Sequence, residues 1–365
     1  MTATMSAAGS AALLAGLPGI GPNRLAELLA DDDPEAVWQL VVAGRVDDPH
    51  AEAWAAVARA ADPAAEAARY AEAEVRVLTR ADAAYPAVLA ADLAPPGVLF
   101  ARGELSALET PRVAIVGTRR CTGTGAGFAR ELGRELATAG VGVVSGLALG
   151  IDGAAHRGVL DAAGVSWAAP IGVVGCGLDV PYPARHRPLW DAVGERGVLL
   201  SEAPLGARPA PWRFPARNRI IAALADLVVV VESHAAGGSL LTVTEAIGRG
   251  IEVLAVPGSV RNPAAAGTNQ LLAEGCHPVT AADDILVALG MVPGGRRSAA
   301  ERRPAPDDDG RRVLEAFDWE PATLEQLVLR TGLALGVLAL SVQQLLDAGW
   351  IMAQGSWYER VPSVP

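Results

Sequence analysis

The stretch of residues 112–127, R-V-A-I-V-G-T-R-R-C-T-G-T-G-A-G, constrains the fold of this chain most strongly. Residues 113–116 are a short, β-branched, apolar run of the kind that forms a strand buried on both faces. Gly117 ends this run, and a glycine-rich turn leads into a helical pattern that continues through Leu136. Because a helix N-terminus presents free backbone N–H groups, a strand, a glycine turn and a helix in this order predict a phosphate-binding turn.

Three known phosphate-binding or catalytic turns can be compared with this one. The dinucleotide fingerprint G-x-G-x-x-G requires a glycine where Phe128 stands, after Gly123 and Gly125. The Walker loop requires a lysine, and all 30 cationic side chains of this protein are arginines. The nucleophile elbow G-x-S-x-G is also absent from the turn. The turn, with Arg119 and Arg120 inside it, therefore indicates phosphate binding but specifies no cofactor. A glycine turn that only packs a helix on a sheet is the alternative.

Length and composition exclude several classes of protein. A chain of 365 residues can form two or three domains with a sizeable core. No apolar run approaches the roughly 18 residues that a membrane span requires, and the first ten residues lack the cationic segment of a signal peptide. Three widely spaced cysteines argue against disulfides and zinc sites. We therefore expect a soluble cytoplasmic protein without a membrane partner.

The charge distribution separates the middle of the chain from its ends. A net charge of −11 disfavours a nucleic-acid partner for the chain as a whole. Residues 112–220, however, carry 13 arginines against 8 acidic residues, and they form the only positive third of the sequence. Since salt confines the field of a charge to about 8–10 Å, the local sign matters more to a phosphate than the total does.

Strand and helix patterns alternate from residue 113 onward. After 113–116, the strand candidates are 142–145, 171–175, 198–201, 227–231 and 252–256, and two more precede them, at 74–80 and, a short one, at 98–101. This alternation predicts an α/β fold, an extended Rossmann-like, doubly wound and mainly parallel sheet. Ligands of such sheets bind beyond the carboxyl ends of the strands.

Smaller domains flank the large one, which we assign to residues 74–290. Residues 1–73 are helical, and P-G-I-G-P at 18–22 resembles the helix-hairpin-helix motif; because acidic residues follow it, we favour a structural module over a phosphate site. A charged linker spans 291–310, and 311–365 are typical of a winged-helix domain. Its third helix, at 335–348, has no arginine, which favours protein contact or a weak DNA role over reading of a DNA groove.

The candidate binding residues follow the predicted strand ends. Residues 208–219 hold four arginines and two aromatic residues, Trp212 and Phe214, without one acid. Arginines can hold phosphates, and aromatic faces can stack unpaired bases. The alternative for Phe214 is a buried role in the core. For Arg217 and Arg219 the alternatives are solvation or pairing with Glu202 or Asp226. The full candidate set is Gly117, Thr118, Arg119, Arg120, Ser145, Gly146, Gly175, Gly177, Arg185, Arg187, Phe214, Arg217, Asn218, Arg219, Gly237, Gly238 and Ser239.

Seven segments in a fixed order resemble the DNA-processing protein A (DprA/Smf) family. They are V-A-I-V-G-T-R-R, S-G-L-A-L-G-I-D, G-C-G-L-D-V-P-Y-P, S-E-A-P-L-G-A-R-P, F-P-A-R-N-R-I-I, G-S-L-L-T and V-P-G, and the resemblance covers residues 75–290. It implies a homodimer that binds single-stranded DNA and loads the RecA recombinase during natural transformation. The family tends to have an asparagine where this chain has His186.

No catalytic group or metal site is expected. Asp152 and His156 are four residues apart, but Asp152 is a natural helix N-cap, and we assign structural roles to both as well as to Asp179 and Glu202. We therefore expect a protein that is not an enzyme and has no cofactor. The alternative is a nucleotide-processing enzyme of the phosphoribohydrolase type. Residues 237–245 resemble the G-G-x-G-T-x-x-E loop of such enzymes, although Leu240 and Leu241 replace its Gly-Thr pair.

Overall fold

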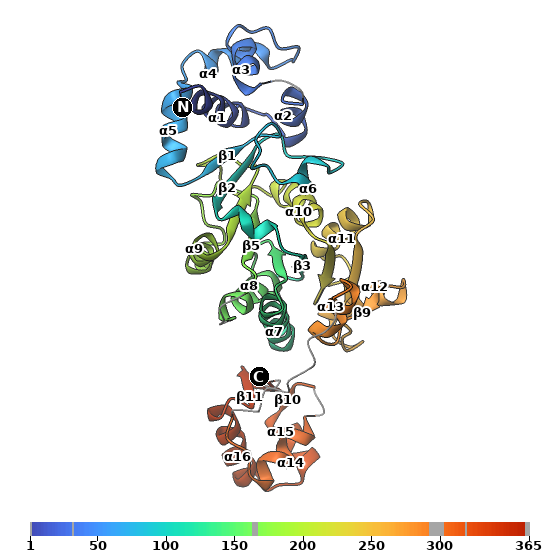
Figure 1. Cartoon of the computed structure of the whole chain (residues 1–365). Coiled ribbons are helices and arrows are strands. Elements are labelled where there is room, and N and C mark those ends of the chain that lie inside the picture. The colour runs from blue at the N-terminus through green and yellow to red at the C-terminus, as the bar shows by residue number, and fades with distance from the viewer. Residues whose placement is uncertain (1, 31–32, 163–166, 292–302, 318–319, 362–365) are drawn as a thin grey trace. The chain divides into compact units, whose positions relative to one another are not determined.

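The computed structural model describes residues 2–30, 33–162, 167–291, 303–317 and 320–361 (Figure 1). The chain divides into two compact units, and the main change of unit along the sequence comes after residue 292. Each unit is described by itself.

The first unit is built on a nine-stranded sheet with the order β1-β2-β6-β5-β4-β3-β7-β8-β9. The seven neighbouring strands β6, β5, β4, β3, β7, β8 and β9 run parallel to one another. Strand β2 is antiparallel to β6, and β1 is antiparallel to β2. The strands span Arg76–Leu78 (β1), Leu99–Gly103 (β2), Arg112–Val116 (β3), Gly142–Ser145 (β4), Pro170–Val174 (β5), Val198–Ser201 (β6), Leu227–Val230 (β7), Glu252–Ala255 (β8) and His277–Pro278 (β9). The predicted doubly wound, mainly parallel sheet is therefore confirmed.

Helices cover both faces of this sheet, which explains the unbroken apolar runs of its central strands. Ile220 of α10 and Val243 of α11 join the hydrophobic cluster on one face, and Trp190 of α9 joins the cluster on the other. The helices of this region are α6 (Ala87–Ala90), α7 (Gly123–Thr138), α8 (Ile151–Asp161), α9 (Arg187–Arg196), α10 (Arg213–Leu224), α11 (Ser239–Ile247), α12 (Ala266–Ala273) and α13 (Ala282–Ala288).

The N-terminal segment folds into α1 (Thr2–Ala15), α2 (Pro22–Leu28), α3 (Pro34–Val42), α4 (Ala51–Ala58) and α5 (Pro63–Glu72). As predicted, helices flank the P-G-I-G-P turn. Gly19 in this turn has φ +73°, a backbone conformation that favours glycine. The indole N–H of Trp54 donates to the Pro18 carbonyl at 2.9 Å and so fixes the turn to α4.

These helices share a core with the sheet, beside β1 and β2 (Figure 1). The ring of Tyr70 stacks on that of Phe100, with 5.2 Å between centroids, and its hydroxyl accepts the Leu205 N–H at 2.9 Å. Leu14 and Val174 belong to the same hydrophobic cluster. The domain boundary that we predicted at residue 73 therefore marks the change from helices to the sheet. The hydrophobic core continues across this boundary.

The second unit has the predicted winged-helix elements. They are α14 (Asp308–Ala316), β10 (Ala322–Thr323), α15 (Leu324–Thr331), α16 (Leu335–Asp347), β11 (Ile351–Gln354) and β12 (Trp357–Arg360). Helix α14 begins at Asp308, three residues before the predicted boundary, because the Asp307 side chain accepts the Gly310 N–H and caps it. Most of the predicted linker lies outside the described residues. Of the helices in the described ranges, none is by itself long and apolar enough to cross a membrane, and one bent pair, α15 with α16, passes on length and composition together.

Candidate nucleic-acid interface

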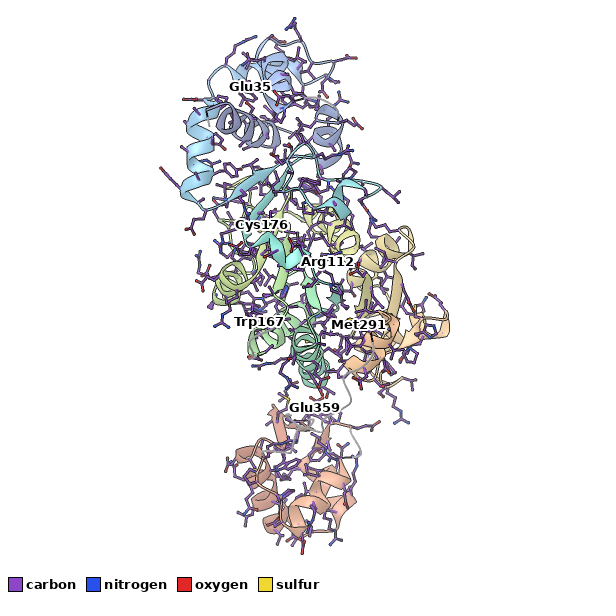
Figure 2. The ribbon with its side chains drawn as sticks, in the orientation of Figure 1. Glu35, Arg112, Trp167, Cys176, Met291 and Glu359 are labelled. Atoms are coloured by element: carbon purple, nitrogen blue, oxygen red, sulfur yellow. The ribbon has the colours of Figure 1, made fainter. Side chains whose placement is uncertain are left out.

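The strand order creates a crevice between the loops that follow β3 and β7. From β3 the chain builds outward through β4, β5 and β6, and then returns to the opposite side of β3 as β7. The two loops therefore diverge at the carboxyl edge of the sheet, which is where open α/β sheets bind ligands. Trp167 and Cys176, labelled in Figure 2, precede and follow β5 and so mark the amino and carboxyl ends of that strand.

A cleft of about 370 Å³ occupies this switch point. The loops are joined at its base, where the Thr118 N–H donates to the Glu232 carbonyl at 2.7 Å. The cleft brings together ten of the residues singled out in the sequence, from four separate segments. They are Gly117, Thr118, Arg119, Asp152, Phe214, Arg217, Asn218, Gly237, Gly238 and Ser239.

Exposed cations and aromatic rings form one rim of this cleft. The guanidinium carbon of Arg119 lies 5.0 Å from the centre of the Phe214 ring, and Tyr182 lies 5.5 Å from Phe214 on a tilted plane. Arg119, Arg120 and Tyr182 are exposed, and Phe214 is half-buried. Sequence reasoning missed Tyr182, since no spacing rule connects it to a ring 32 positions later. We call Arg119, Tyr182 and Phe214, together with the exposed Arg120 that follows Arg119 in the chain, the rim.

Arg217 forms the floor of the cleft. It is only 6 % exposed; one of its terminal nitrogens donates to the Val173 carbonyl at 2.5 Å, and within the described structure its Nε has no hydrogen-bond partner. Burial lowers the pKa of Arg217 to about 10, and the charge of Asp152 partly offsets this. Burial likewise raises the pKa of Asp152, although Arg217 and the Gly146 N–H, at 3.2 Å, oppose the rise. The floor thus holds a buried cation with an unused N–H donor.

Arg219 is not free to hold a phosphate, and that expectation is wrong. It is 9 % exposed; its guanidinium is ion-paired with Glu202 and donates to the Ala94 carbonyl at 2.7 Å. Two residues along a helix point to different sides of it, so Arg217 and Arg219 meet different surroundings. Pairing with Glu202, which we had named as the alternative for Arg219, is what the structure shows, and Glu202 comes from the loop after β6.

Four further candidates lie in the interior rather than at a binding surface. Ser145 is fully buried, and its hydroxyl donates to the Ile115 carbonyl at 2.6 Å. A Cβ on Gly146 would lie 1.8 Å from a terminal nitrogen of Arg217, and one on Gly177 would lie 2.6 Å from the Asp179 carboxylate. Gly175 is buried as well. Our prediction that these residues let a phosphate approach is therefore wrong. The space beside them is filled by other groups of the protein itself.

The two glycines of the loop after β7, Gly237 and Gly238, differ in the space around them. A Cβ on Gly237 would lie 2.3 Å from the Ser233 hydroxyl, whereas one on Gly238 would meet nothing within 4 Å. The Ser239 hydroxyl donates to that of Ser233 at 2.9 Å. Gly238 is therefore the position of this loop where an approaching ligand would meet open backbone.

Arg185 and Arg187 are exposed on either side of the buried His186. The His186 Nδ1 lies 3.0 Å from the Leu147 carbonyl oxygen, so the residue at which this chain departs from its resemblance serves the interior. The two arginines project outward, outside the lining of the switch-point cleft.

The residues to which we assigned structural roles form internal contacts. We had predicted that Asp152 is the N-cap of α8, and this is wrong. The N-cap is Gly150, with φ +78°, and Asp152 lies in the first turn of the helix. The His156 Nε2 lies 3.2 Å from the Ile171 carbonyl oxygen, and burial lowers the pKa of His156 to about 4. Both carboxylate oxygens of Asp179 accept the Gly206 N–H, at 2.8 and 3.0 Å, and so hold the loop after β6.

Fold and cleft together define a Rossmann-like protein with a cationic, aromatic-rimmed cleft at the switch point of its sheet. The model of the family described as DNA recombination-mediator protein A matches residues 76–290, and that of the DprA winged helix domain matches residues 297–347. The chain belongs to the DNA recombination-mediator protein A family, and its C-terminal unit is a DprA winged-helix domain.

Curated relatives agree with this assignment. The chain is 40% identical over 255 residues to the putative DNA processing protein DprA of Mycobacterium tuberculosis, which covers 67% of this chain and 64% of that protein. It is 37% identical over 272 residues to protein Smf of Escherichia coli, covering 73% and 72% of the two chains. The chain thus spans somewhat less than two thirds of the length of its mycobacterial relative.

Solved structures of the family have the same fold. The DNA processing protein A of Streptococcus pneumoniae superposes with a TM-score of 0.64 at 32% identity, covering 75% of this chain and 95% of that one. That of Helicobacter pylori, described for its single-stranded DNA binding mode, superposes with a TM-score of 0.52 at 29% identity, covering 59% and 95%.

Proposed function

We propose that this protein binds single-stranded DNA in the switch-point cleft. The observation that carries the proposal is the position of Arg119 against Phe214 at the rim of a cleft whose floor is the buried cation Arg217. Phosphate oxygens are acceptors for the exposed Arg119 guanidinium, and the buried positive charge of Arg217 at the floor of the cleft adds to the attraction of a phosphate. Phe214 and Tyr182 offer ring faces to bases. Membership of a family with a single-stranded DNA-binding relative supports this.

The aromatic rim makes the proposal specific for single strands. A base can stack on Phe214 only when it is unpaired, whereas arginines alone attract the phosphates of any nucleic acid. Single strands should therefore compete out duplex of equal length. Fluorescence anisotropy with a labelled oligonucleotide and unlabelled competitors measures this preference, and equal competition by both forms would leave only a general electrostatic surface.

The contribution of the rim cation is tested with a matched pair of variants. Arg119→Ala removes the exposed guanidinium at Phe214, and it should weaken binding and reduce the slope of log affinity against log salt by about 0.7. Arg45→Ala removes another exposed arginine, from the N-terminal helical segment, whose side chain forms no ion pair with any described residue, and it should change neither quantity. Equal effects of both variants would contradict the assignment of the cleft.

We extend the proposal to what family membership implies: a homodimer that hands its single strand to the RecA recombinase and catalyses no reaction on it. The expected results are a dimer in sedimentation and faster RecA assembly on strands coated with single-strand-binding protein. A monomer, or RecA assembly that is unchanged, would remove this part and leave strand binding untouched.

The phosphoribohydrolase alternative loses support from the position of Glu245. An enzyme of that type needs the glutamate of its glycine-rich loop at the substrate. Here Glu245 is ion-paired with Arg249 at 2.5 Å and is not part of the described cleft lining. We expect no release of free base from nucleoside monophosphates in a chromatographic assay, and release at a rate above background would reinstate the enzyme.

A further inference from the structure

A second groove begins on the other side of the first turn of α10. It has a volume of about 850 Å³ and lies between the N-terminal hairpin, residues 19–22, and the side chains of Trp212 and Arg213. A small cavity of about 40 Å³ shares Trp212 and Arg213 with this groove, and it shares Arg217 with the switch-point cleft. The N-terminal hairpin groove and the cleft are therefore joined across the start of one helix.

Trp212 presents an aromatic face to this groove. Half of its surface, 52%, is exposed, although tryptophan is highly buried on average. The guanidinium carbon of Arg213 lies 4.7 Å from the centre of the indole ring, and Arg213 forms no ion pair with a carboxylate in the described ranges. The pair offers a flat apolar surface beside a cation, which is the combination that binds a nucleotide by its base and its phosphate.

The opposite wall of the groove is open and nearly neutral. Cβ atoms on Gly19 and Gly21 would meet no heavy atom within 4 Å, so the hairpin backbone is not covered by the protein's own side chains. Glu66, the acid that lines the groove, is ion-paired with Arg69 at 2.6 Å. A phosphate entering the groove therefore meets no uncompensated carboxylate on this described wall.

We propose that the hairpin groove is a second subsite for the same DNA strand, in which an unpaired base stacks on Trp212 beside Arg213. The strand continues over the first turn of α10 to Phe214 and Arg217. The inference rests on single-stranded DNA binding in the switch-point cleft, and it gives the N-terminal helices a role beyond a structural module. According to this inference, the groove binds an unpaired base and the phosphate attached to it, and it does not bind the backbone of a duplex.

Oligonucleotide length separates the two subsites. A strand of about 4 nucleotides can occupy the switch-point cleft alone, and one of about 16 can reach both subsites. Trp212→Ala should lower affinity for the longer strand roughly 5- to 100-fold and leave the shorter one unchanged. Trp357→Ala removes an indole of similar exposure, 46%, from β12 of the winged-helix unit and is the matched control.

A charge placed on the opposite wall provides an independent test. Gly21 is the N-cap of α2 with φ −95° and open space around it, so aspartate and asparagine both fit and both favour that position. Gly21→Asp adds a negative charge to the groove and should weaken binding of the longer strand, most strongly at low salt. Gly21→Asn has the same shape without the charge and should bind as the parent does.

The outcomes distinguish this inference from the proposal on which it rests. If Trp212→Ala and Gly21→Asp bind both strands as the parent does while Arg119→Ala weakens both, the groove proposal is overturned and the cleft stands. Equal losses in Gly21→Asp and Gly21→Asn would also overturn it, because a change of shape would then explain the effect. If the parent protein binds neither strand, the cleft itself fails.

Discussion

Arginines occur both at the rim of the switch-point cleft and in the buried layer beneath it, but they differ in what their guanidinium groups bind. At the rim, Arg119 is exposed and rests on Phe214. In the buried layer, Arg217 donates to a strand carbonyl and Arg219 is ion-paired with Glu202. An exposed arginine keeps its hydrogen-bonding capacity for a ligand, whereas a buried one must satisfy the protein first. The number of arginines in a segment therefore overstates how many can hold DNA.

The largest effect that separates the two layers is expected from Arg219→Ala. This change leaves Glu202 in the interior without its cation, and breaking such a pair costs about 3–5 kcal/mol of unfolding free energy. Arg119→Ala should stay within about 0.5 kcal/mol of the parent, since Arg119 is exposed. Urea unfolding measures both values.

The distinction between exposed and buried arginines would be contradicted if the Arg219→Ala variant kept the parent's stability but lost its affinity for DNA. Arg219 would then be a direct contact, and the ion pair with Glu202 would not hold in solution. Loss of affinity together with loss of stability carries no information about contact, which is why the two measurements belong together.

The interior of the sheet domain should also respond to acid, through the buried His156. Its pKa in the folded protein, about 4, lies below the ordinary value of about 6.5 because burial disfavours the charged ring. Between these values the unfolded chain binds a proton that the folded chain does not. The stability from the neutral ring is thus present above pH 6.5 and is lost as pH falls towards 4, by at most about 3 kcal/mol.

His156→Gln removes this titration and keeps a hydrogen-bonding group near the Ile171 carbonyl. Between pH 7 and pH 4.5, the unfolding free energy of this variant should fall less than that of the parent. A parallel fall in both proteins would show that other groups carry the acid response.

A third, smaller effect tests the aromatic half of the rim. Phe214→Ala removes a ring face on which a base can stack, worth about 1–3 kcal/mol of binding free energy for one base. Phe214→Tyr keeps the ring and should bind single strands as the parent does. If alanine and tyrosine variants bind equally well, Phe214 serves only as a platform for Arg119.

The sheet could be predicted from the sequence because its signals are local. Each β-branched run between glycine-rich turns became a strand, and the crevice at the switch point followed from their alternation. Gly117 and Gly146 mark where a side chain does not fit, but the sequence does not say what approaches them: Ile151 and Arg217 do. Asp152 was misplaced as a cap because Gly150, with its positive φ, extends the helix start by two residues.

Contacts between distant segments were beyond the reach of pattern analysis. The sequence offered Glu202 only as one of two possible partners of Arg219, and the stacking of Tyr70 on Phe100 joins residues whose spacing follows no periodicity. The latter contact attaches the N-terminal helices to the sheet, so a truncation after residue 73 would expose core rather than isolate a domain. The same attachment brings the hairpin to Trp212 and creates the second groove.

The smallest effect on stability, and on affinity at physiological salt, is expected from Arg185 and Arg187, which are exposed outside the cleft lining. If the strand passes over them, each forms one phosphate contact at the surface, so the double alanine variant should reduce the salt slope by about 1.4 with unchanged stability. Affinity at physiological salt should change less than in Arg119→Ala, because neither arginine lines the cleft and charges at a distance from the strand are screened there. Anisotropy titrations at four salt concentrations measure the slope, with Arg45→Ala as the control. An unchanged slope would place both arginines outside the path of the strand and confine the cationic rim to Arg119 and Arg120.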